Sequence, residues 1–195
     1  YVLFPLPEFP ATQIRSDINY CYTTGMKIAV FSDSHDHIEA LSAALARVKE
    51  LGITTGLHLG DFCAPFITTM LADSGLKWFA VWGNNDGDKL QGFRITAGKT
   101  APDGSPAFEV ASGDFMELTL GERKLFLTHY PDIARIAALS GQFEAVFFGH
   151  NHKQSSETLN NALLANPGEL CGTRFGVRSF MIYDTDSNTV EHLEF

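Results

Sequence analysis

The sequence predicts an α/β fold in which two mixed β-sheets pack together and are flanked by helices. In the first part of the folded region, apolar runs typical of buried strands alternate with amphipathic helices, which is the pattern of parallel βαβ units. Further along the chain, the expected strands come in pairs joined by short polar turns, which is the pattern of antiparallel hairpins. A chain with both patterns is expected to build mixed rather than purely parallel sheets.

Met26 marks the expected start of the folded domain, because the segment KIAVFS that follows it has the pattern of a buried strand. We expect residues 26–195 to form a single domain, since 195 residues are few for two. Residues 1–25 are rich in proline and aromatic residues, show no clear period and lack the basic start of a secretory signal. We expect them to be an extension outside the core: a non-native leader, an upstream stretch from a misassigned start codon, or an arm that packs on a neighbour.

The first half of the domain is expected to hold three strands and two helices. The strand at 27–32 leads into a helix at about 38–51, whose apolar residues recur every three or four positions and which Gly52 ends. The elements that follow are a short strand at 56–59, a helix at 65–73, a strand at 77–82 and a loop-rich stretch at about 87–113, which contains two prolines and five glycines. This long loop is the expected substrate-selecting rim.

The second half is expected to hold two hairpins separated by a helix and a strand. The runs 116–120 and 124–128 are joined at Gly121-Glu122, and the runs 179–184 and 189–194 flank the polar turn TDSN. Between the hairpins, the pattern predicts a helix at 132–140 and a strand at 145–148.

The composition excludes several classes of partner. Hydrophobic residues make up 45% of the chain, which suits a globular core. The net charge is −9 with histidine neutral, so extended nucleic acid is not an expected partner, because such binding relies on basic residues that displace counterions. No apolar run approaches the ~20 residues that span a membrane. The three cysteines show no close pairing, which favours a reducing compartment, and we expect a cytoplasmic protein.

Five of the expected strands end in short clusters of oxygen- and nitrogen-bearing side chains. Each cluster alone has an ordinary explanation as a helix cap, a turn or a buried histidine. Together they indicate one site, because the carboxyl ends of strands in α/β sheets form binding crevices. Imidazole and carboxylate ligands suit divalent ions of borderline character, whereas a structural zinc site would need cysteine thiolates in a Cys-x-x-Cys pattern that the chain lacks. The clusters are Asp33-Ser34-His35, Gly60-Asp61, Gly83-Asn84-Asn85-Asp86, Thr128-His129 and Gly149-His150-Asn151-His152.

The order of these motifs, DSH, GD, GNND, TH and GHNH, resembles that of the calcineurin-like metallophosphoesterases. The short length and the late Asn166-Pro167-Gly168 turn are similar to their small YfcE-type phosphodiesterase branch. The resemblance covers about residues 26–195 and implies a four-layer αββα sandwich. It implies one metal ion held by Asp33, His35, Asp61 and His152. It implies a second metal ion held by Asp61, Asn84, His129 and His150, so that Asp61 bridges the two divalent ions. Mn²⁺ is the expected metal, with Fe, Ni, Co or Zn as alternatives.

The resemblance implies a phosphodiesterase that hydrolyses a small phosphate ester. A hydroxide between the two metals would attack phosphorus, with Asp61, Asn84 and His129 at the catalytic centre. Only two of the seven metal ligands carry formal charge, so the site keeps a charge of about +2 and attracts a phosphate oxyanion into an acidic protein. The residues expected to contact substrate are Asn84, Asn85, Asn151 and Tyr130.

Three positions depart from the family pattern. Asn85 stands where phosphatases of the family have a general-acid histidine, and an amide cannot donate a proton at neutral pH. We therefore expect a preference for leaving groups that are weakly basic, such as aryl or nucleotide-like groups. Tyr130 stands where glycine is common, and Glu169 stands where serine often follows Asn-Pro-Gly.

Two rival functions remain open on the sequence. A phosphomonoesterase would use the same centre. A non-catalytic protein-binding scaffold would keep the fold, as the eukaryotic retromer subunit of this family does after losing part of its metal set, and retention of all seven ligands disfavours it. Assembly into a homo-oligomer is implied by the resemblance alone.

Overall fold

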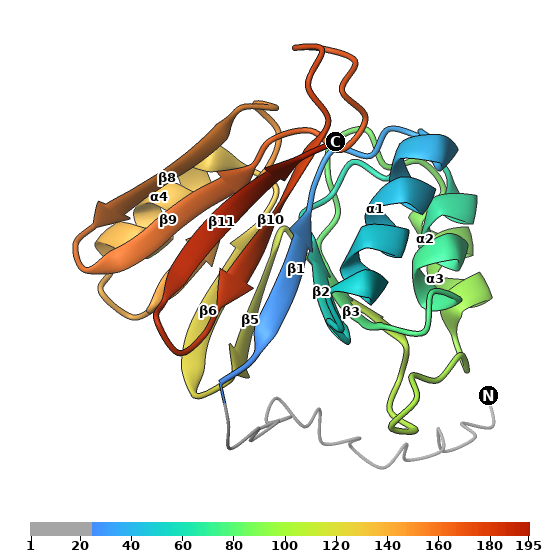
Figure 1. Cartoon of the computed structure of the whole chain (residues 1–195), viewed down its shortest axis with the longest axis horizontal. Coiled ribbons are helices and arrows are strands. Elements are labelled where there is room, and N and C mark those ends of the chain that lie inside the picture. The colour runs from blue at the N-terminus through green and yellow to red at the C-terminus, as the bar shows by residue number, and fades with distance from the viewer. Residues whose placement is uncertain (1–24) are drawn as a thin grey trace, which may run out of the picture.

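Two β-sheets pack face to face between layers of helices in the computed structural model, which describes residues 25–195 (Figure 1). The six-stranded sheet has the order β11-β10-β1-β2-β3-β4, and the five-stranded sheet has the order β5-β6-β7-β9-β8. Helices α1, α2 and α3 cover the outer face of the first sheet, and α4 covers that of the second (Figure 1). The αββα sandwich predicted from the sequence is confirmed.

The bounds of the elements follow the predicted periods closely in most places. The helices are α1 (Ile38–Glu50), α2 (Pro65–Ala72), α3 (Lys89–Thr96) and α4 (Pro131–Leu139). The first sheet consists of β1 (Lys27–Phe31), β2 (Thr55–His58), β3 (Lys77–Ala80), β4 (Phe108–Val110), β10 (Ser179–Asp184) and β11 (Thr189–Glu194). The second consists of β5 (Phe115–Leu120), β6 (Arg123–Thr128), β7 (Ala145–Phe147), β8 (Gln154–Leu159) and β9 (Ala162–Pro167).

Side-chain alternation along the strands builds two separate cores. In β1, Ile28 and Val30 face the second sheet, whereas Ala29 and Phe31 face α1, and all four are fully buried. This alternation is the strand period of two, and here both faces of the strand are apolar because both are covered. A strand such as β1 thus packs against a helix on one face and against the other sheet on the opposite face. This packing on both faces fixes the position of its end.

Parallel pairing at the centre of each sheet directs several strand ends to one edge. β1, β2 and β3 pair in parallel in the first sheet, and β6, β7 and β9 do so in the second. The backbone N–H of Asp33, after β1, donates to the carbonyl oxygen of Gly60, after β2, at 3.1 Å. The N–H of His150, after β7, donates to Oδ2 of Asp33 at 3.1 Å, so the edges of the two sheets meet there.

The sequence predicted a loop-rich stretch at 87–113, but the structure shows that this stretch contains α3 and β4. Helix α3 has a weak apolar stripe, with Leu90 and Phe93 exposed, and its start depends on the Asp88 side chain, which accepts the N–H of Gln91. The hairpin of β8 and β9 was also not predicted. β8 is a polar edge strand with the sequence QSSETL, which lacks the apolar alternation of a strand with one buried face.

Within residues 25–195, no helix combines the length and the apolar character needed to cross a membrane. The predicted extension, residues 1–25, lies outside the described residues except for Gly25.

Candidate metal centre

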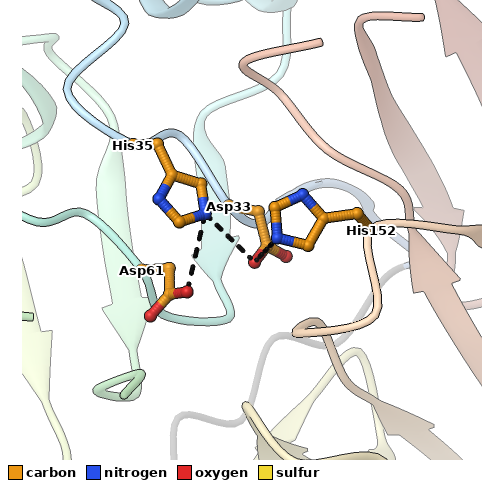
Figure 2. Close-up of side chains that lie close together, drawn as sticks. All are labelled: Asp33, His35, Asp61 and His152. Carbon is orange, nitrogen blue, oxygen red and sulfur yellow. Dashed lines mark ion pairs between the residues drawn. The ribbon is translucent and has the colours of Figure 1, made fainter. Parts of the chain in front are cut away.

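Five strand ends deliver the predicted ligands to one place. Asp33, Asp61 and Asn84 follow β1, β2 and β3 of the first sheet, while His129 and His150 follow β6 and β7 of the second. Figure 2 shows the side chains of Asp33, His35, Asp61 and His152 turned toward one another. All seven predicted metal ligands therefore meet in the structure, although they are spread over 120 positions of the sequence.

Four of these side chains form a group of the right size for one ion. One ligand atom from each of Asp33, His35, Asp61 and His152 lies within 4.8 Å of the others. Asp33 Oδ1 is 3.2 Å from His152 Nε2 and 3.7 Å from His35 Nε2. Ligand atoms that share an ion at ~2.1 Å lie roughly 3 to 3.4 Å apart. The group thus has the spacing of a metal site.

A second group lies beside the first and shares Asp61 with it. His129 Nε2 is 3.1 Å from Asn84 Oδ1, 3.3 Å from His150 Nδ1 and 3.5 Å from Asp61 Oδ2. The same Asp61 oxygen is 3.5 Å from His35 Nε2 in the first group. Asp61 therefore stands between the two groups, which is the position expected of the bridging ligand that the family resemblance implies.

Two buried atoms at this centre lack a hydrogen-bond partner among residues 25–195. They are Asp33 Oδ1 and His35 Nε2, which face each other across a gap too long for a hydrogen bond. Leaving a buried polar atom unpaired costs about 1–3 kcal/mol, and more for a charged one. A divalent cation in this gap would satisfy both atoms. The residues present thus fit a metal ion of borderline character.

The charges of the site favour added positive charge. Burial raises the pKa of Asp61, but the hydrogen bonds and charge of His129 and the two hydrogen bonds from Asn85 outweigh it, and the pKa lies well below its usual range. Burial lowers the pKa of His129, yet the carboxylates of Asp61 and Asp33 raise it overall. The pKa of His35 is raised, first by its interaction with Asp33. The same carboxylates that draw protons onto these rings would draw a metal cation.

The backbone at the ligands adopts an uncommon conformation. Five of the seven predicted ligands have φ in the left-handed region, which non-glycine residues seldom adopt and which costs about 1–3 kcal/mol each. These are Asp33 (φ 53°), His35 (φ 41°), Asp61 (φ 58°), His150 (φ 71°) and His152 (φ 64°). Such a concentration of strain is typical of a functional site, where surrounding contacts impose the geometry.

Glycines before three of the ligands allow the strand ends to approach closely. A Cβ atom added at Gly83 would lie 2.2 Å from Asp61 Oδ1, and one at Gly149 would lie 1.9 Å from Ser32 Oγ. At Gly60, whose φ is +93°, a Cβ would lie 2.6 Å from the backbone nitrogen of Gly83. The motifs GD, GNND and GHNH therefore need glycine for space as well as for backbone freedom.

Hydrogen bonds outside the ligand set orient the imidazole rings. His129 Nδ1 lies 2.7 Å from the carbonyl oxygen of Leu59, and His152 Nδ1 lies 2.8 Å from Glu169 Oε2. A partner on one ring nitrogen fixes the tautomer and leaves the other nitrogen free to bind metal. Glu169 is buried, and its role was not predicted, because the contact with His152 depends on the fold. Glutamate in place of the serine that often follows Asn-Pro-Gly marked the position as unusual, but it did not indicate the contact with His152.

The residues predicted to contact substrate all lie at or beside the centre. Asn85 donates both its backbone N–H and its amide N–H to Asp61, at 2.8 and 2.7 Å. Asn151 Oδ1 accepts from Asn166 Nδ2 at 2.9 Å, so the Asn-Pro-Gly turn braces the GHNH loop. The Tyr130 ring lies 5.3 Å from the His129 ring, centroid to centroid, and burial raises the pKa of its phenol.

Two neighbouring residues have structural roles beside the centre. Asp86 accepts from the backbone N–H groups of Gly83, Cys63 and Asp61, at 2.6, 2.9 and 3.2 Å, and so organises the loop rather than facing a substrate. His37 caps α1 by accepting the N–H of Ala40.

Comparison with known proteins identifies the family. A sequence model of the calcineurin-like phosphoesterase superfamily domain matches residues 26–188. The phosphodiesterase MJ0936 of Methanocaldococcus jannaschii is 30% identical over 165 residues, which are 83% of this chain and 94% of the relative. A solved structure of an archaeal phosphodiesterase is 27% identical with a TM-score of 0.77, over 87% of this chain and 100% of its own. Yfce, a phosphoesterase from E. coli, shares the fold with a TM-score of 0.60 at 19% identity, over 86% of this chain and 98% of its own. The chain therefore belongs to the calcineurin-like phosphoesterase superfamily and is a hydrolase acting on phosphoric ester bonds.

Proposed function

We propose that this hydrolase is a phosphodiesterase with a dinuclear metal centre. The observation that carries the proposal is the position of Asp61 Oδ2, which lies 3.5 Å from His35 in one ligand group and 3.5 Å from His129 in the other. One carboxylate can thus hold two ions close together and offset part of their repulsion. The first ion would be held by Asp33, His35, Asp61 and His152, and the second by Asp61, Asn84, His129 and His150.

We infer that Mn²⁺ is the working ion, with Fe, Ni, Co or Zn able to replace it, since the ligands are carboxylate, amide and imidazole. When bound, the ions activate water as a nucleophile at neutral pH and neutralise charge on the phosphate.

Cys63 and Cys171 are both free thiols, which supports a cytoplasmic location for the enzyme.

The proposed ligands differ in how deeply they are buried. Asp33, Asp61 and His129 are buried and form the floor of the site, whereas Asn84 and His150 are exposed at its rim. A phosphate group can therefore enter from the rim side while the floor stays fixed. The Asn84 amide is in position to donate to a phosphate oxygen, and the buried floor excludes bulk water, so charges there act strongly.

A preference for esters with weakly basic leaving groups follows from the chemistry of Asn85 and Tyr130, because neither is suited to donate a proton to the leaving group. The Asn85 amide is engaged with Asp61, and the Tyr130 phenol has a raised pKa and is a weak acid. Esters whose leaving group is already weakly basic, such as aryl diesters, need no such donor. Esters of strongly basic alcohols are expected to react slowly.

Hydrolysis of bis(p-nitrophenyl) phosphate and of p-nitrophenyl phosphate, measured with and without added Mn²⁺, tests the proposal. We expect metal-dependent turnover, faster for the diester than for the monoester. Asp61→Asn should lower kcat on the order of a thousandfold, because it loses the shared charge. Asp73→Asn, an exposed carboxylate on the helical side, is the matched control. Near wild-type activity of Asp61→Asn would refute the bridging role, and faster turnover of the monoester would favour a phosphomonoesterase.

A further inference from the structure

A hollow of about 660 Å³ opens directly beside the metal centre. It is lined by His150, Asn151, Lys153, Arg174 and Phe175. His150 belongs to the proposed ligand set, so the hollow continues from the place where a phosphate would bind. The other wall comes from the segment that links β9 and β10, which rises above the sheets in Figure 1. We call this hollow the cation pocket.

Two basic side chains meet on one aromatic ring in the cation pocket. Lys153 Nζ lies 5.5 Å, and the Arg174 guanidinium carbon 5.7 Å, from the centroid of the Phe175 ring. The ring attracts both cations, so two positive charges border the same aromatic side chain. Phe175 itself is 47% exposed, so its ring remains open to solvent and to a bound molecule.

In the described part of the chain, no carboxylate forms an ion pair with either of these two cations. Of the described residues that line the pocket, none is acidic. The pocket is thus locally positive, although the chain has 23 acidic and 14 basic residues. Two unpaired cations beside a phosphate site provide local attraction for a second negative group.

The pocket is held in register with the metal centre by one buried side chain. Glu169 accepts the backbone N–H groups of Arg174 and Phe175, at 3.0 and 2.6 Å. The same carboxylate contacts the proposed ligand His152 at 2.8 Å. The segment that presents the cations is thus anchored to the site where the ester would be cleaved, as a substrate-binding wall requires.

We propose that the cation pocket binds an anionic substituent of the substrate. The preferred substrates are then phosphodiesters in which one ester arm carries a second negative group, a phosphate or a carboxylate. This inference rests on the proposed function and adds the substrate class. Lys153 and Arg174 contact the second anion, and Phe175 holds them in place.

A pair of chromogenic diesters tests this inference. Phenyl 4-nitrophenyl phosphate and 4-carboxyphenyl 4-nitrophenyl phosphate release the same leaving group and differ only in one carboxylate. The Mn²⁺-loaded enzyme should show a lower KM for the carboxylated diester, by about five- to tenfold, with similar kcat. This preference should weaken in high salt, because the pocket is open to solvent.

Lys153→Met and Arg174→Met keep long side chains and remove the charge. Each should raise KM for the carboxylated diester at least about threefold more than it raises KM for the phenyl diester, with similar kcat for both. Lys49→Met, an exposed lysine in the last turn of α1, makes the same charge change away from the pocket and should alter neither substrate.

The outcomes separate the two proposals. Metal-dependent turnover of both diesters with equal KM, or a preference that survives in both pocket variants, would overturn the cation pocket and leave the phosphodiesterase intact. Turnover of neither diester would overturn the proposed function, and the pocket's role with it.

Discussion

Glu169 lies outside the proposed ligand set and contacts one of its members, His152. It is 1% exposed and lies 2.8 Å from His152 Nδ1, so it orients the ring and makes Nε2 a better donor to a metal. Glu169→Gln keeps the shape and can still accept the two backbone N–H groups, but it loses the charge. We expect Mn²⁺ affinity to fall about tenfold or more, measured by titration of the metal-free protein. Glu157→Gln on the exposed strand β8 is the control, and equal affinity in both variants would contradict the role of Glu169.

Gly83 is the residue whose replacement should damage the site most directly. A Cβ atom there would lie 2.2 Å from Asp61 Oδ1 and 2.5 Å from the Asp61 backbone nitrogen, and neither atom can move without displacing the ligand. Gly83→Ala should therefore lose metal binding and lower the free energy of unfolding by about 1–3 kcal/mol. At Gly113, an added Cβ meets nothing within 4 Å. Gly113→Ala should bind metal normally, and a Gly83→Ala protein that does the same would contradict the close-approach argument.

For single residues, the sequence indicates the proposed metal ligands better than the residues that hydrogen-bond to them. Asp33, Asp61 and His129 could be singled out because each lies within three residues of a strand end, and the family resemblance then implied their roles as ligands. Two supporting residues could not be found in this way. They are Glu169 and Ser32, whose hydroxyl donates to Asp33 Oδ2 at 2.6 Å. Their contacts depend on how the segments pack after folding.

Strand β2 contains a histidine whose burial makes stability depend on pH. His58 is fully buried, with Nδ1 accepting the Gly60 N–H and Nε2 facing Ser34 Oγ, and burial lowers its pKa to about 3. The unfolded chain therefore binds a proton that the folded chain does not between pH 6.5 and about 3. The contribution of His58 is fully present above pH 6.5 and is lost as pH falls, by about 1.4 kcal/mol per pH unit.

Urea unfolding of the metal-free protein between about pH 6 and pH 4.5 measures this effect. His35 and His129 have raised pKa values, so their contribution is complete below pH 6.5 and is lost only as pH rises. In the acid window, we expect a steep slope for the wild type and a shallower one for His58→Gln. Equal slopes would show that His58 does not stay neutral in the folded state.

Element prediction succeeded where the hydrophobic period is strong and failed where it is weak. The hairpin of β10 and β11 has the predicted bounds, and α4 is displaced by a single residue. Helix α1 is correct, but Ile38 and Leu51 at the ends of its predicted stripe are exposed. Neither helix α3 nor strand β8 has a periodic apolar face that could indicate it in the sequence. Helix α3 depends on the Asp88 cap, and β8 depends on its pairing with β9.

For the whole molecule, the metal centre lies where the two sheets meet, and metal should stabilise the fold. His150 and Asp33 come from different sheets and are joined by a hydrogen bond of 3.1 Å. A ligand that binds only the folded state adds about 2.7 kcal/mol at one hundred times its Kd. Mn²⁺ should therefore raise the Tm of the wild type in a thermal melt, and a chelator should reverse the shift. An equal Mn²⁺-induced shift in Asp61→Asn would mean that the stabilising ion binds elsewhere.

The number of metal ions bound per chain tests the central claim most directly. Metal-free protein is equilibrated with excess Mn²⁺, freed of unbound ions and analysed by elemental mass spectrometry against protein concentration. The convergence of seven ligands around Asp61 predicts two ions per chain in the wild type and fewer in Asp61→Asn. One ion or none in the wild type, or two in the variant, would contradict a dinuclear centre bridged by Asp61.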